Sequence, residues 1–135
     1  MASIPVGASG SFTLMVGAEH LADRFKDATL PPVLATPVMI MAMENAALNA
    51  IKPFLGARES AVGTRVDVLH LAATPLGRQV VAAAQVTRVD GRRIEFKIEA
   101  HDGVAPIGAG THERIVIDIV RFLARLNQQA SSAVP

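Results

Sequence analysis

The sequence predicts an α+β fold in which one long central helix is wrapped by a five-stranded antiparallel sheet. Two observations support this prediction. Residues 34–55 are almost unbroken hydrocarbon, and the chain after Gly63 consists of short apolar segments separated by glycine and proline turns. Because 135 residues fit one domain, we expect a single domain over residues 1–135, with residues 1–9 and 127–135 as flexible tails.

The first elements are a short strand and the long helix. The segment FTLMV, residues 12–16, reads as the first strand. Thr36 marks the start of the helix because its side chain can cap free N–H groups, and Pro37 suits the first helical position. Pro53 and Gly56 mark its end.

Four further segments read as antiparallel strands. Asp90-Gly91 is a two-residue hairpin signal between the second and third of them, and turns rich in glycine and proline separate the others. A sheet wrapped around a single helix leaves edges and an apolar face that a second copy can cover, so we expect a homodimer. The four segments are GTRVDVLHLA (63–72), RQVVAAAQVTRV (78–89), RRIEFKIEAHD (92–102) and GTHERIVIDIV (110–120).

The composition argues against several classes of function. Aromatic residues make up 4% of the chain and the formal charge is +1, so neither base stacking nor phosphate binding is favoured, and we expect no nucleic-acid partner. There is no cysteine, and none of the four histidines forms an H-x-x-x-H pair, so we expect no disulfide and no metal site. The apolar stretch falls short of the ~20 residues a membrane span needs, and the first residues lack the features of a signal peptide. We expect a cytoplasmic protein without membrane association.

One carboxylate, Glu44, interrupts the apolar helix. At 100° per residue it falls among the apolar positions, away from a polar edge formed by Asn45, Asn49 and Lys52. We therefore expect Glu44 to be buried, where it could act as a general base or orient a water molecule. The alternative is a structural carboxylate, paired with Arg114 or capped by backbone N–H groups.

His70 and Thr36 are the other candidates for chemistry. His70 shares one strand face with Val66 and Val68, where it could take up a proton near neutral pH or be a core histidine satisfied by a carbonyl. Thr36 could be an N-cap alone, or stand where free N–H groups stabilise a developing oxyanion. Eight residues of helix place Thr36 and Glu44 about 12 Å apart along the axis. A site that uses both must therefore draw on two subunits, or one of them acts through another residue.

Three stretches resemble the hot-dog thioesterases, and most closely the fluoroacetyl-CoA thioesterase family: ATPVMIMAMENAALNAIKPFL, SAVGTRVDVLHLAATPLG and VTRVDGRRIEFKIEAHDGVAPIGAGTHERIVID. The similarity covers roughly residues 33–126. It implies an acyl-CoA hydrolase that works at a dimer interface, with Thr36, Glu44 and His70 as catalytic residues. It also implies no cofactor, because coenzyme A enters as part of the substrate.

The resemblance also points to substrate-binding residues. Gly63 and Arg114 match the family's glycine and arginine. We expect the Gly63 N–H to polarise the thioester carbonyl, and Arg114 suits either a coenzyme A phosphate or a carboxylate such as Glu44, of which we favour the carboxylate. Where the fluoroacetyl specialist carries aromatic residues before the threonine, this chain has Leu30 and Leu34. We therefore expect a small or medium acyl-CoA substrate; the alternative is a non-catalytic dimer that binds acyl-CoA or another small ligand.

Overall fold

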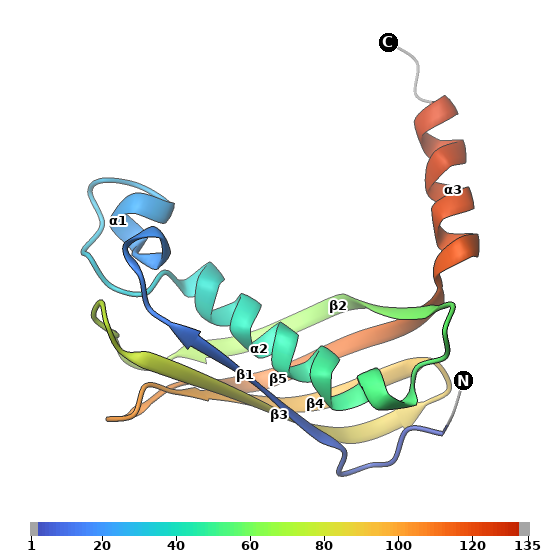
Figure 1. The fold of residues 1–135 in the computed structure, drawn as a ribbon, viewed down its shortest axis with the longest axis horizontal. Helices are drawn as coiled ribbons and strands as arrows, with labels where there is room; N and C mark the ends of the chain where they lie inside the picture. The colour runs from blue at the N-terminus through green and yellow to red at the C-terminus, as the bar shows by residue number, and fades with distance from the viewer. Residues whose placement is uncertain (1–2, 133–135) are drawn as a thin grey trace.

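The computed structural model describes residues 3–132, which form one curled antiparallel sheet around a long helix (Figure 1). The strands lie in the order β1-β3-β4-β5-β2, and every neighbouring pair is antiparallel. This arrangement confirms the predicted fold. The elements are β1 (Ser9–Met15), η1 (Ala18–His20), α1 (Ala22–Phe25), α2 (Thr36–Ile51), η2 (Lys52–Phe54), β2 (Glu59–His70), β3 (Gln79–Asp90), β4 (Arg93–His101), β5 (Pro106–Asp118) and α3 (Ile119–Ser132).

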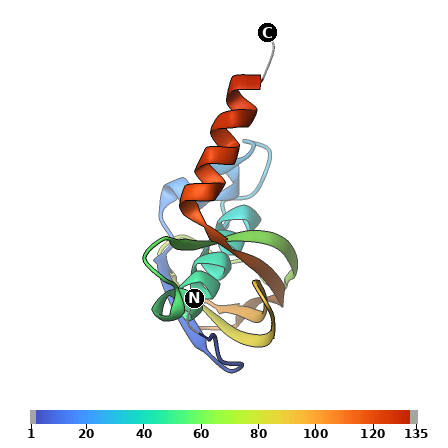
Figure 2. The same cartoon turned by 90° about the vertical axis from the view of Figure 1, so that its right-hand side faces the viewer.

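Helix α2 lies in the concave face of the sheet (Figures 1 and 2). In β3 and β4 nearly every second side chain is buried, as the two-residue period of a strand requires. On α2 the small side chains of Ala46 and Ala50 are buried where the helix meets Gly10 of β1, whose missing side chain leaves room for the helix backbone. The core therefore fixes α2 against the sheet, and with it two of the predicted site residues.

The start of α2 differs from the prediction by one residue. Ala35 is the N-cap, it makes no capping hydrogen bond through its side chain, and Thr36 is the first helical residue, followed by Pro37. The proposed capping role of Thr36 is therefore wrong, because its hydroxyl lies inside the first turn and bonds elsewhere. At the other end α2 stops at Ile51, two residues before the proline that was expected to end it.

The N-terminal segment is not the tail that was expected over residues 1–9. Ile4 is buried in the core, and the Gly7 N–H donates to the Val86 carbonyl at 2.8 Å. Strand β1 begins at Ser9, three residues before the predicted start. The first two residues of the expected tail lie outside the described part of the chain.

Helix α3 differs from the prediction, which was a strand followed by a tail over residues 127–135. It extends away from the sheet (Figures 1 and 2), and none of its residues is buried. Residues 127–132 continue the helix, and residues 133–135 lie outside the described chain. Within residues 3–132, no helix combines the length and apolar character needed to span a bilayer. Three exposed apolar side chains share one side of α3: Phe122, Leu123 and Leu126.

Candidate active site

Thr36 and His70 meet at the start of α2. The Thr36 Oγ1 lies 2.7 Å from the His70 Nδ1. Burial lowers the pKa of His70, and a hydrogen bond with the Ala72 backbone partly opposes this effect. The imidazole is therefore neutral at pH 7 and able to take up a proton from a hydroxyl or from water.

The same pair opens into a hollow of about 380 Å³. Leu30 and Leu34, the predicted substrate-binding residues, line it together with Thr36, His70 and Lys26. The walls come from the segment after α1, the start of α2 and the end of β2. A hollow that combines apolar side chains with a few polar groups is a usual form of a small-ligand site.

The remaining predicted residues form a second group farther along α2. The Arg114 Nη1 lies 4.0 Å from the Glu44 Oε2 and 3.5 Å from the Glu44 carbonyl oxygen, and the Arg114 Nη2 donates to the Ala61 carbonyl at 2.7 Å. Burial lowers the pKa of Arg114, and the charge of Glu44 opposes this shift. The predicted pairing of Arg114 with Glu44 is thus present as a long contact.

Glu44 is not buried as the sequence analysis expected. Its side chain is 37% exposed. The carboxylate faces Gly63 on the edge strand β2, where nothing among the described residues covers the outer side of the strand. Within one chain the carboxylate therefore keeps contact with water.

Gly63 is required where Glu44 approaches β2. An ideal Cβ on residue 63 would lie 2.9 Å from the Glu44 Oε2 and 3.3 Å from the His112 Cε1. We expect Gly63→Ala to push the carboxylate aside, because the end of a flexible side chain yields more easily than backbone. The thioester hydrolysis expected from the resemblance should then fall about tenfold in kcat, while the free energy of unfolding should change by about 1 kcal/mol or less. Kinetics and thermal unfolding of the same preparation check this; loss of stability with unchanged kcat per folded molecule would contradict it.

His112 belongs to this second group, although the sequence analysis gave it no role. It is 2% exposed, its Nδ1 lies 2.7 Å from the Arg65 carbonyl oxygen, and its Nε2 lies 3.2 Å from the Arg114 Nη1. The one available signal was its spacing, since residues 112 and 114 share a face of the strand.

The two groups are separate in one chain. Among residues 3–132, no hydrogen bond or ion pair joins Thr36 or His70 to Glu44 or Arg114. Gly63 and His70 are seven residues apart on β2, which is about 23 Å of extended strand. The expectation that Thr36 and Glu44 cannot meet within one chain agrees with this geometry.

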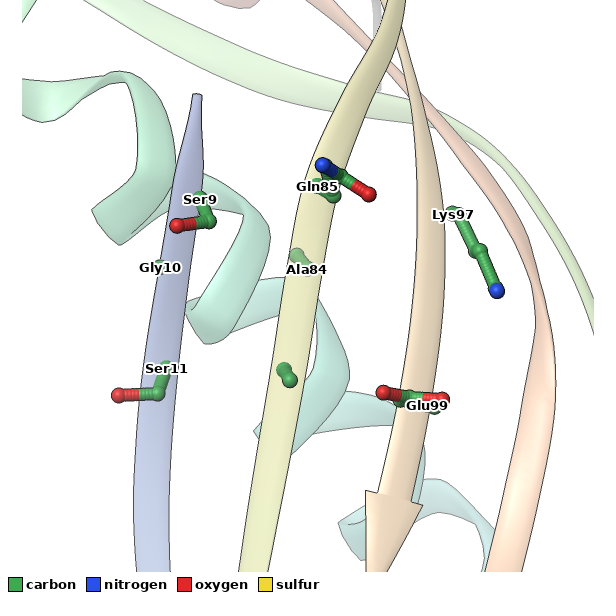
Figure 3. Close-up of a pocket in the computed structure, with 8 residues that line it drawn as sticks. Ser9, Gly10, Ser11, Ala84, Gln85, Lys97 and Glu99 are labelled. Atoms are coloured by element: carbon green, nitrogen blue, oxygen red, sulfur yellow. The ribbon is translucent and has the colours of Figure 1, made fainter. Parts of the chain in front are cut away.

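A different hollow, of about 490 Å³, lies on the face of the sheet away from α2 (Figure 3). Its polar lining comes from Ser9, Ser11, Gln85, Lys97 and Glu99 on three neighbouring strands. No predicted site residue lines it. The chemistry expected from the sequence therefore belongs to the hollow at Thr36 and His70.

Comparison with known proteins adds a family to this geometry. A family model described as fluoroacetyl-CoA-specific thioesterase matches residues 16–120. The chain belongs to this family. A fluoroacetyl-CoA thioesterase from Streptantibioticus cattleyicolor is 44% identical over 102 residues, which are 76% of this chain and 73% of that protein. The predicted class of enzyme, a thioester hydrolase, is thereby confirmed.

Solved structures of thioesterases share the whole fold. A structure of the fluoroacetyl-CoA thioesterase superposes with a TM-score of 0.88 at 37% identity, covering 93% of this chain and 97% of that one. A thioesterase superfamily member from Thermus thermophilus gives a TM-score of 0.88 at 30% identity, with 98% and 100% covered. These similarities confirm the predicted hot-dog fold of the family.

Proposed function

We propose that this member of the fluoroacetyl-CoA thioesterase family hydrolyses a small or medium acyl-CoA to the free acid and coenzyme A, in a site shared by two subunits of a homodimer. The observation that carries the proposal is the hydrogen bond between Thr36 and His70 in the hollow at the start of α2. Leu30 and Leu34 give this hollow an aliphatic wall that suits an acyl chain. Aliphatic walls offer no group that recognises fluorine, so we expect acyl esters without fluorine to be accepted as well.

The chemistry needs water, a group that takes up a proton and a group that stabilises the oxyanion. Neutral His70 takes a proton from the attacking water, directly or through the Thr36 hydroxyl. Thr36 begins α2, so the positive end of the helix dipole lies at the hollow, where the thioester oxygen gains charge. The C–S bond then breaks, and the coenzyme A thiolate leaves and is protonated. Glu44 from the other subunit orients the water.

The edge strand β2 supports a shared site. It lies at the end of the sheet, and its Val66 and Leu69 side chains are exposed. Edge strands pair readily with a second copy, and a two-fold axis between residues 66 and 67 sets Gly63 of one subunit opposite His70 of the other. The group around Glu44 then lies beside Thr36 and His70 of the partner.

Helix α3 supports the same arrangement. It follows Asp118, which pairs with Glu59 at the start of β2, and β2 ends at His70. Antiparallel pairing of the two β2 strands therefore brings α3 of one subunit to the end where His70 of the other lies. The apolar side of α3, uncovered in one chain, then has a second copy to pack against.

The proposal is tested by measuring free-thiol release from acetyl-, fluoroacetyl-, phenylacetyl- and medium-chain acyl-CoA esters, with EDTA present and no added cofactor. We expect turnover, with kcat/KM about 10²- to 10⁴-fold lower in His70→Asn because the proton acceptor is lost. Circular dichroism of the variant controls for folding. Saturable binding of the esters without thiol release would favour the non-catalytic acyl-CoA binding dimer instead.

A further inference from the structure

We propose that His112 is a positioning residue, which holds Arg114 in the one orientation that fixes Glu44 beside Gly63. The inference rests on the proposed function, because it gives the buried imidazole a part in hydrolysis. His112 itself is too deeply buried to touch a substrate in the hollow at Thr36.

The partners of His112 determine its tautomer. A carbonyl oxygen only accepts hydrogen bonds and a guanidinium only donates them. The Nδ1, 2.7 Å from the Arg65 carbonyl, must therefore carry the proton, and the Nε2 must accept from the Arg114 Nη1 at 3.2 Å. Phe96 stacks on the ring at a centroid distance of 5.7 Å, which fixes its plane.

The Arg65 carbonyl owes its position to an irregularity in β2. The register of β2 against β5 shifts between Gly63 and Arg65, which is the mark of a β-bulge. The hydrogen bond from His112 ties this bulge to β5. The same imidazole thus holds the strand next to Gly63 and the guanidinium that faces Glu44.

The chain of contacts continues from Arg114 to Glu44. The Nη2 is held by the Ala61 carbonyl at 2.7 Å, and the Nη1 lies between the His112 Nε2 and the carboxylate. With the Nη1 held by the imidazole, the guanidinium cannot turn away from Glu44. Among the described residues, the Arg114 guanidinium at 4.0 Å is the one charged partner of the Glu44 carboxylate.

Electrostatics favour the neutral imidazole that this arrangement requires. Burial lowers the pKa of His112, and so does the charge of Arg114. The hydrogen bond with the Arg65 carbonyl and the charges of Glu44 and Glu113 raise the pKa. A proton on the Nε2 would face the guanidinium N–H and break the contact. The neutral form is therefore the one that holds Arg114 at pH 7.

Two substitutions separate the two bonds of the imidazole. His112→Asn places an amide near the Nδ1 and can keep only the Arg65 contact, whereas His112→Gln reaches the Nε2 position and can accept from Arg114. We expect kcat to fall about 10- to 100-fold in His112→Asn with little change in KM, and His112→Gln to recover most of the loss. His101→Asn, at an exposed histidine, is the matched control and should keep wild-type kinetics. Equal kcat values in the Asn and Gln variants, per folded molecule, would overturn the proposal.

Structural readouts keep the test independent of turnover. Nitrogen-15 NMR of the wild type should find His112 as the Nδ1–H tautomer; the Nε2–H tautomer would overturn the proposal. A crystal structure of His112→Asn should show Arg114 displaced from Glu44, and an unmoved Arg114 would also overturn it. If the wild type releases no thiol while both structural results hold, the proposed function fails but the positioning of Glu44 by His112 stands.

Discussion

A dimer that combines one His70→Ala subunit with one Glu44→Ala subunit should hydrolyse acyl-CoA at about half the wild-type rate, whereas either variant alone should lose about 10²- to 10⁴-fold. The reason is the separation of Thr36 and His70 from Glu44 within one chain. If each site takes His70 from one subunit and Glu44 from the other, the mixed dimer places both lesions in one site. The other site is then intact.

The measurement uses two affinity tags, co-expression and sequential purification, followed by thiol release per dimer. The matched control is a dimer of one wild-type subunit and one subunit that carries both His70→Ala and Glu44→Ala. Each of its sites then has one lesion, so it should be nearly inactive. A site contained in a single chain predicts the reverse: the control would keep about half the rate and the mixed dimer would have none.

Much of the fold could be predicted from the sequence because it depends on local patterns of apolar residues and turns. Strands β3 and β4 alternate buried and exposed side chains, and glycine and proline separate the elements, so both the sheet and the long helix were predicted. One error concerns residues whose burial depends on packing between distant segments, and the other concerns a helix that makes no buried contact in one chain. Ile4 is buried in the core, and the segment that follows it bonds to β3 through the Gly7 N–H and the Val86 carbonyl. Helix α3 buries none of its residues in one chain.

The site also has features that could be predicted from the sequence and features that could not. Helix geometry alone predicted that Thr36 and Glu44 cannot meet in one chain. The hydrogen bond between Thr36 and His70 was not predicted, because it depends on the end of β2 reaching the first turn of α2. The role of His112 depends on the Arg65 carbonyl, which an irregularity in β2 presents. No spacing in the sequence encodes that irregularity.

Gly10→Ala should be among the most destabilising single substitutions in this protein. An ideal Cβ on residue 10 would lie 2.6 Å from the Ala46 carbonyl oxygen and 2.8 Å from the Ala50 Cα, and closer still to the Ala50 nitrogen. All three atoms are helix backbone, which cannot rotate away as the Glu44 carboxylate can from Gly63. We expect a loss of about 3 kcal/mol in the free energy of unfolding, seen as a Tm lower by about 10 °C.

The effect should reach the site, because α2 carries both Thr36 and Glu44 and must move away from β1 to admit the methyl group. The matched control is Ser11→Ala, the next residue on β1, whose side chain points to the opposite face of the sheet. It should stay within about 0.5 kcal/mol of the wild type and keep its kcat. A wild-type Tm in Gly10→Ala would contradict this prediction. It would mean that α2 does not pack closely against β1 at Gly10, so that this contact does not determine the distance between the helix and the sheet.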